Sequence, residues 1–238
     1  IFLGTLNTLF SKEIILLSSL LLITILMRLL IKDLKKEDQY TIIGTAIIVF
    51  VYRAMPSPGA GLNWFEIDVL GFNQSFFSLL SVTSALITLG GMIILRKIMM
   101  VTPLAKLFIV LSIFSAALYM PSLFMYYELH NYTIVLTNGI VDAKFIAILN
   151  TAVESPLSQV AMIPMLAWIA KNAPSKYKAT FFAVFASFTN IALSARELFT
   201  TYLNKIFVIK RKVLDLQTNH VLESANYEDL DNLLICLI

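Results

Sequence analysis

Long apolar runs alternate with short polar breaks along most of this chain, and few charges lie inside the runs. The run at residues 14–31 contains a single charged residue, Arg28, and a helix of that length crosses most of a hydrocarbon core of about 30 Å. Strict alternation is lacking, and lipid tolerates only helices or closed barrels. The pattern therefore predicts an all-α, polytopic membrane helical bundle. Its spans are expected at residues 13–31, 40–55, 73–95, 103–125, 143–170 and 178–206, and a seventh is expected to start at 230.

Composition agrees with a protein that has the lipid bilayer as its solvent. Of 238 residues, 58% are hydrophobic and 14% are charged, and the mean hydropathy is +0.82. Soluble domains carry about 25% charged residues. A net charge of +3 is too small, and the Lys and Arg residues are too scattered, to suggest nucleic acid as a partner. The single cysteine, Cys236, excludes an intrachain disulfide and an all-cysteine metal site.

The two ends of the sequence suggest a fragment. The chain begins with Ile1 instead of Met, without the basic segment and cleavage site of a signal peptide. The apolar stretch 233–238 is interpreted as a truncated spanning helix, and a short amphipathic tail is the alternative.

Basic residues in the loops predict the orientation. Loops 32–39, 96–106 and 171–178 each carry three Lys or Arg residues, whereas loops 56–72 and 126–142 carry none. By the positive-inside rule the basic loops are cytoplasmic in a multi-pass protein of the cell membrane. Segment 205–229 is then expected outside, although it is itself rich in both basic and acidic residues.

Polar and small residues recur at helical spacing in three spans and predict inward-facing files. Either the files line a solute path or they let helices pack closely without a pore. The third span has Gln74, Ser78, Ser81, Ala85 and Thr88; the fifth has Thr151, Glu154 and Ser158; the sixth has Ala183, Ser187, Asn190, Ser194, Glu197 and Thr201.

Charged residues inside the spans favour a solute path over simple helix packing. A carboxylate at helix depth costs roughly 2.5–3.5 kcal/mol on the insertion scale, so Glu154 is a candidate for binding solute or protons. Glu197 and Arg196 are further candidates on the sixth span. Arg53 either extends to the outer interface or offers its planar fork to an anion.

Prolines and aromatic residues mark the ends and bends of spans. Residues 56–61 cannot continue a helix and are predicted to form a tight external turn. Beyond that turn, Trp64 and Phe65 are typical of interfacial anchors. Pro156 and Pro164 lie within the fifth span and predict kinks that bend during gating, or a static bend.

Chemistry-bearing motifs point away from an enzyme. Neither histidine has another histidine or a cysteine at ligand spacing, and the nucleophile, zinc and phosphate-loop motifs are absent from the sequence. We therefore expect neither catalysis nor a bound cofactor.

Two stretches resemble known transporters. Gly71-Phe72, Gly90-Gly91 and Arg96-Lys97 resemble the cytoplasmic Gly/Arg loop of the major facilitator superfamily. A more specific likeness is to the penultimate helix pair of the folate–biopterin transporter family, in which a Gln-x-x-x-x-Pro-x-Leu helix, a Cys-Pro turn and an Ala-Thr-x-Phe-Ala…Asn helix follow one another. Here the matching residues are Gln159, Pro164, Leu166, Ala173, Pro174, Ala179, Thr180, Phe182, Ala183 and Asn190.

The resemblance implies a six-helix half of a twelve-helix major facilitator protein. Residues 1–31 would end the N-terminal half, 32–39 would be the cytoplasmic linker, and 40–238 would be the C-terminal bundle, truncated in its last helix. The rest of the N-terminal half would be the missing partner. Two halves of this kind expose a central site alternately to each side of the membrane.

The function expected from this likeness is secondary active, proton-coupled transport of a small solute such as folate or a pterin. Gln159 and Asn190 would be hydrogen-bonding wall residues. The alternatives are a major facilitator transporter of a peptide, sugar, nucleotide or drug, a non-transporting membrane scaffold, and a membrane-embedded enzyme.

Overall fold

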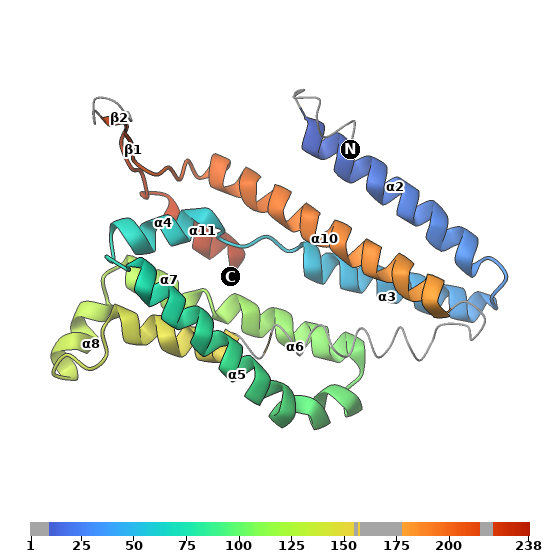
Figure 1. The fold of residues 1–238 in the computed structure, drawn as a ribbon, viewed down its shortest axis with the longest axis horizontal. Coiled ribbons are helices and arrows are strands. Elements are labelled where there is room, and N and C mark those ends of the chain that lie inside the picture. The colour runs from blue at the N-terminus through green and yellow to red at the C-terminus, as the bar shows by residue number, and fades with distance from the viewer. Residues whose placement is uncertain (1–9, 155–156, 158–177, 215–220) are drawn as a thin grey trace.

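The computed structural model describes residues 10–154, 157, 178–214 and 221–238. Nearly all of the described chain is helical, which confirms an all-α bundle (Figure 1). The helices are α2 (Ser11–Ile31), α3 (Lys36–Ala54), α4 (Ala60–Asp68), α5 (Gln74–Val101), α6 (Leu104–Ala117), α7 (Met120–Tyr126), α8 (His130–Leu136), a helical segment over 143–154, α10 (Lys178–Ile206) and α11 (Leu230–Leu237). Two short antiparallel strands, β1 (Val213–Leu214) and β2 (Val221–Glu223), lie between α10 and α11.

Within the described residues, four helical stretches are long and apolar enough to cross a membrane. They are Ser11–Ile31, Gln74–Ile98, Ala105–Tyr126 and Lys178–Ile206. These match the spans predicted at 13–31, 73–95, 103–125 and 178–206. The span predicted at 40–55 coincides with α3. This helix is shorter than the four stretches above, and it has charged residues near both ends. The span predicted at 143–170 begins as a helix and then continues outside the described residues.

The main core lies between α2, α3, α6 and α10. Side chains from all four helices form one buried cluster, which includes Met27, Val49, Phe108 and Phe185. The helices α3 and α10 run in the same direction, because contacts advance together along both: the Phe50 ring lies 5.2 Å from that of Phe188, and Ala54 packs against Ala192 and Ala195.

The chain after α3 does not make the expected tight turn. Helix α3 ends at Ala54 because the residue before Pro56 is disfavoured in a helical conformation, and Pro56 and Pro58 cannot donate backbone hydrogen bonds. Residues 55–58 are then extended, and α4 continues beyond the end of α3 (Figure 1). The prediction of a tight turn was wrong: α3 and α4 are two parts of an interrupted helix.

Two residues of α10 hold this interruption in place. The hydroxyl of Thr200 accepts a hydrogen bond of 3.0 Å from the backbone N–H of Ser57, and the amide of Asn204 donates one of 2.9 Å to the carbonyl of Pro58. Gly59 has φ +62°, and a Cβ there would overlap the methyl group of Thr200. A Cβ on Gly61 would overlap the Asn204 side chain. Glycine is therefore required at position 59, and a Cβ at position 61 would displace the Asn204 side chain that bonds Pro58.

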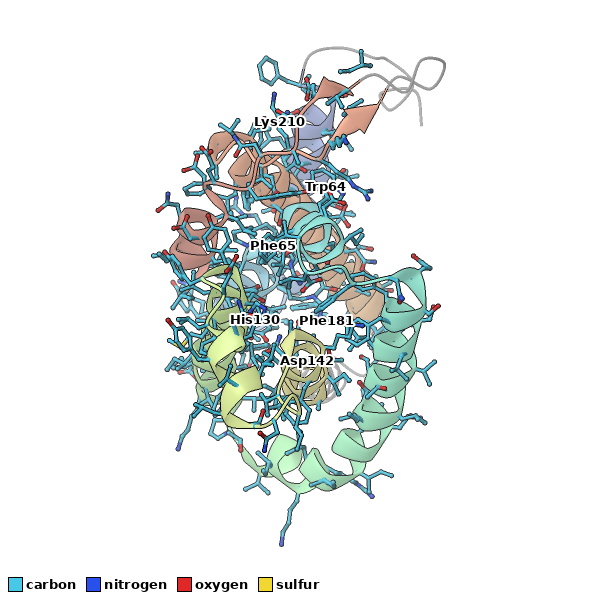
Figure 2. All side chains as sticks on the ribbon, turned by 90° about the vertical axis from the view of Figure 1, so that its left-hand side faces the viewer. Trp64, Phe65, His130, Asp142, Phe181 and Lys210 are labelled. Atoms are coloured by element: carbon cyan, nitrogen blue, oxygen red, sulfur yellow. The ribbon has the colours of Figure 1, made fainter. Side chains whose placement is uncertain are left out.

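A second cluster forms at one end of the bundle from segments that are distant in sequence. Phe65 of α4 packs among Ile209 and three fully buried leucines of α11. Its ring also lies 5.6 Å from that of Tyr126 and 5.9 Å from that of Tyr227. Figure 2 views this end and shows Trp64, Phe65, His130 and Lys210, which come from three different segments. Phe65 is thus a core residue, and its expected role as an interfacial anchor was wrong.

Polar contacts tie segment 205–229 to the same end. Arg211 forms an ion pair of 3.2 Å with Asp68 of α4, and the hydroxyl of Tyr227 donates a 2.6 Å hydrogen bond to that carboxylate. The hydroxyl of Tyr126 donates to the carbonyl of Glu228 at 2.7 Å. The loops predicted as external, 56–72, 126–142 and 205–229, therefore meet at one end. The membrane side on which this end lies stays a prediction.

Helix α11 occupies the place where a seventh span is expected to start. It buries Leu230, Leu233 and Leu234 against its neighbours and leaves Ile235 and Cys236 exposed. Its eight residues pack on α7. The helix is amphipathic, and whether it begins a span stays a prediction, as do the proposed domain boundaries.

Candidate functional site

Helix α10 presents two faces of opposite character. Its buried face carries Phe181, Val184, Phe185, Phe188, Ala192 and Ala195 and packs on α2 and α3. Its opposite face is the file that the sequence predicts, with Ala183, Ser187, Asn190, Ser194, Glu197 and Thr201, and all six residues are exposed. Both faces follow from the helical period.

The exposed polar face of α10 is unsuited to lipid. Its hydroxyls satisfy their hydrogen bonds on the helix itself: Ser194 donates to the carbonyl of Asn190 at 3.3 Å, and Thr201 donates to that of Glu197 at 2.8 Å. The Asn190 and Glu197 side chains still add polar groups that are costly to place in hydrocarbon. In a bilayer this face must therefore meet water or further protein.

Arg196 is the centre of a group of charged and phenolic side chains from several elements. Its charge acts on Glu154, at the end of the 143–154 segment, and on Arg53, in the last turn of α3. The phenol groups of Tyr52 and Tyr119 are also within range of this charge. The structure thus brings together three residues that the sequence predicts separately: Arg53, Glu154 and Arg196.

The phenol groups connect this cluster to α6 and α7. Tyr52 of α3 is hydrogen-bonded to the side chain of Ser115 of α6. Tyr119, directly before α7, interacts electrostatically with Arg196, Glu154 and Tyr52. Four elements therefore contribute polar groups at the level where α3 ends, and this level is a candidate solute site.

A comparison with protein-family models identifies the class of protein. The model of the BT1 family matches residues 11–236. This chain belongs to the BT1 family. The match confirms the resemblance to folate–biopterin transporters and makes the chain part of a family of membrane transporters. Searches of curated proteins and of solved structures found no match.

One carboxylate of this BT1 chain was missed by the sequence interpretation. Glu66 of α4 is half-buried, and its charge is within range of Glu154. Burial and, to a smaller extent, the negative charge of Glu154 together raise the pKa of Glu66 to about 7. The sequence offers no clear signal for it, because Asp68 lies two residues further along and distant segments decide which face of α4 is buried.

Buried polar side-chain atoms without a hydrogen-bond partner occur at several places in the bundle. Within the described parts of the chain these are Arg53 Nε, His130 Nδ1, Asn150 Oδ1 and Asn204 Oδ1. Asn150 precedes Glu154 by four residues, so both lie on one face of the 143–154 segment. Arg53 Nε can donate and Asn150 Oδ1 can accept a hydrogen bond, as a polar solute would require.

The remaining candidates have different outcomes. Ser78 and Ser81 are exposed on α5, where Ser81 donates to the carbonyl of Phe77 at 3.0 Å, and no contact described for residues 74–101 joins them to Arg196. Gln159, Ser158, Pro156 and Pro164 lie outside the described residues. Among described residues, no group of three or more His, Cys, Asp or Glu side chains could hold a metal ion.

Proposed function

We propose that this chain is half of a proton-coupled secondary transporter for anionic folate or pterin compounds, working by alternating access. The observation that carries the proposal is the gathering of Arg53, Glu154 and Arg196 beside a polar face of α10 that is unsuited to lipid. Membership of the BT1 family supports the transporter class.

The two arginines supply the chemistry for an anion. A guanidinium is planar and always charged, and it can hold a carboxylate through two parallel hydrogen bonds. Arg53 is half-buried and its Nε lacks a partner among the described residues. Asn190 of α10 and Gln159 of the fifth span would add neutral hydrogen bonds to the wall of the site.

Glu154 supplies a physical link between proton and solute. While ionised, Glu154 attracts Arg196 and competes with a solute anion for it. When Glu154 takes up a proton, that attraction ends and the Arg196 charge is available for the anion. Proton and anion would therefore bind together and be released together, which is symport.

A second six-helix half would cover the polar face of α10. Broken helices near such interfaces position binding sites in many transporters, and here the interruption between α3 and α4 lies next to Arg53. Rocking of the two halves would open the site to each side in turn, with bends at Pro156 and Pro164 acting as gates.

Uptake into proteoliposomes tests the proposal. The protein is expressed from its complete gene and assayed with and without an inward proton gradient. Glu154→Gln should abolish gradient-driven uptake of folate or a pterin, whereas Glu223→Gln, which changes an exposed carboxylate of β2, should not change it. Gradient-driven uptake that persists in Glu154→Gln would contradict the coupling role.

Competition defines the solute. Unlabelled folate and pterin should inhibit uptake, and panels of peptides, sugars, nucleotides and drugs should not. Inhibition by one of those panels alone would identify another solute. A non-transporting scaffold remains the alternative from another class, and it predicts that the α10 polar face is a packing seam closed to water.

A further inference from the structure

The short helix α8 and the turn that follows it, together residues 129–141, have hydroxyl groups on the inner side and apolar side chains on the outer side. Thr133 and Thr137 are partly buried. The outer side is formed by four apolar side chains that are 69–82% exposed, namely Tyr132, Val135, Leu136 and Ile140. A helix on the surface of a water-soluble protein has the opposite arrangement. The outer side of segment 129–141 is therefore suited to apolar surroundings.

Hydrogen bonds of the two threonines close this segment on itself. The hydroxyl of Thr133 lies 2.7 Å from the carbonyl oxygen of His130 and 2.8 Å from that of Val141. The hydroxyl of Thr137 donates to the carbonyl of Thr133 at 2.6 Å and accepts a bond of 2.9 Å from the backbone N–H of Val141. The backbone N–H of Gly139 donates to a carbonyl of α8 at 2.8 Å. Polar groups are thus satisfied within the segment, which is the condition that contact with lipid imposes.

The neighbours of the segment in the chain place it beside the membrane. The stretch Ala105–Tyr126, long and apolar enough to cross a bilayer, ends shortly before α8, and the 143–154 segment starts shortly after it. Ile113 and Met120 of that stretch are exposed apolar residues and form a surface for acyl chains. Figure 1 shows α8 at the periphery of the bundle, beside the start of the 143–154 segment. The apolar side of α8 therefore continues a surface that already faces lipid.

The charge pattern favours the same surroundings. Residues 129–141 contain no Asp, Glu, Lys or Arg, although Glu128 and Asp142 lie directly on either side. Tyrosine, present here as Tyr132, is enriched where acyl chains meet headgroups. The exposed amides of Asn131 and Asn138 would be solvated at the level of the headgroups. No charge in the segment opposes its contact with lipid.

We propose that segment 129–141 is an interfacial membrane anchor, with its four exposed apolar side chains inserted among the upper parts of the acyl chains. Amphipathic helices at an interface bury their apolar face in this way. The anchor that the sequence predicts at Phe65 is thereby assigned to a different loop at the same end of the bundle. This inference concerns how the protein sits in the bilayer and does not depend on the proposed transport function.

Depth-dependent fluorescence quenching tests the contact with lipid. The protein expressed from its complete gene, with its native cysteines replaced (Cys236→Ser in this chain), is labelled with an environment-sensitive fluorophore at Leu136→Cys. It is then reconstituted into phosphatidylcholine vesicles that contain spin-labelled lipid. Quenching should be about twofold stronger with the spin label near the headgroup than with the label near the chain end, because interfacial helices insert only about 5–10 Å. Aqueous iodide should quench this fluorophore weakly.

Two other exposed apolar positions are matched controls. Leu222 of β2 lies at the same end and is 63% exposed, but the ion pair of Lys210 with Glu223 lies in its hairpin, so Leu222→Cys should be quenched by iodide and not by spin-labelled lipid. Ile113 is 66% exposed within the spanning stretch, so Ile113→Cys should be quenched more by the deep label. A melting temperature in detergent close to that of wild type shows that each variant is folded.

Three results would overturn the proposal. Iodide quenching at Leu136→Cys as strong as at Leu222→Cys would show that α8 lies in water. Protection from iodide and from both lipid labels would show that protein, such as a second copy of the chain, covers this surface. A depth equal to that of Ile113→Cys would show that the segment enters the hydrocarbon core instead of lying at the interface.

Discussion

At the scale of single residues, Arg196 gives the site its chemical character. It is an exposed residue of α10, yet its charge reaches side chains of α3, of the 143–154 segment and of the α6–α7 junction. None of these residue types indicates a binding site by itself, and it is their proximity to one another that makes them a candidate site. Their effects on transport are therefore expected to depend on one another.

Neutralising either arginine should weaken solute binding. For Arg53→Gln or Arg196→Gln we expect KM for an anionic solute to rise about tenfold or more, since a hydrogen bond to a charged group is worth roughly 1.5–3 kcal/mol. Arg28→Gln, an exposed position of α2, is the control and should leave KM unchanged. Initial rates of uptake in proteoliposomes measure these values. An unchanged KM in both arginine variants would exclude anion binding by this cluster.

Gly59 is expected to be the most sensitive glycine of the interrupted helix. Its φ of +62° and ψ of −145° lie in a region that is almost restricted to glycine, and a Cβ there also overlaps Thr200. Gly59→Ala should lower the melting temperature in detergent more than Gly139→Ala, which has φ +87° but open space around it. Thr200→Ser removes the overlapping methyl group and keeps the hydroxyl, so it should restore part of the loss. No difference between the two glycine variants would show that the close approach is unimportant.

At the scale of elements, the two faces of α10 could be predicted from the sequence, because both follow one helical period. The path of the chain after α3 could not. Pro56, Pro58 and Gly59 show where a helix stops, but its continuation is decided by Thr200 and Asn204, which lie more than 140 residues away. Glu66 was missed for a similar reason, since the face of α4 that becomes buried is chosen by Tyr126 and α11.

Thiol reactivity separates a solute path on α10 from a packing seam. In a background with Cys236→Ser, cysteines at Ser187, Asn190 and Ser194 should react with a water-soluble thiol reagent, because their face is polar and exposed. A cysteine at Ala192, which is fully buried on the opposite face, should not react. Solute should slow the reaction at Asn190. Resistance at all three polar positions would favour the scaffold alternative.

At the scale of the whole molecule, contacts between distant loops support the predicted alternation of the spans. Asp68 and Arg211 are 143 residues apart and come from two different predicted loops, and their ion pair places both loops at one end. The basic charges of segment 205–229 had made its placement uncertain from sequence alone. Two of these basic residues have acidic partners: Lys210 forms an ion pair with Glu223, and Arg211 forms one with Asp68.

Labelling of loops from one side of the membrane tests this arrangement. Cysteines at Ser224 and Asn138 should react with an impermeant reagent from the same side, and a cysteine at Lys35 should react from the other. These positions are exposed and lie in the segments 205–229, 126–142 and 32–39. Reaction of Ser224 and Lys35 positions from one side would contradict the topology.

The pH dependence of stability should carry opposite contributions from the two carboxylates of α4. Because the pKa of Glu66 in the folded chain is raised to about 7 from 4.5, the folded state binds more protons, and the Glu66 contribution to stability falls as pH rises through that interval. Burial acts to raise the pKa of Asp68, but hydrogen bonds from Tyr227 and Arg211 outweigh it and lower that pKa. The ionised Asp68 therefore stabilises the fold at neutral pH, and this contribution is lost as pH falls below about 4.

Melting temperatures measured between pH 3 and pH 8 test the direction of both contributions to stability. Relative to wild type, Glu66→Gln should gain stability as pH rises from about 4.5 to about 7. Asp68→Asn should be less stable than wild type at neutral pH and should approach it in acid. Parallel curves for wild type and Glu66→Gln would mean that Glu66 titrates normally.

The outward hydroxyls and inward aromatic rings of α10 also bear on how the protein is made. A nascent helix with this polarity gains little from dissolving alone in lipid, since the groups it would show to acyl chains are its polar ones. Helices α2 and α3, which pack against its Phe181, Phe185 and Phe188, precede it in the chain. Stable placement of α10 is thus expected to depend on helices synthesised earlier, and variants that weaken this docking should lower the amount of folded protein as well as uptake.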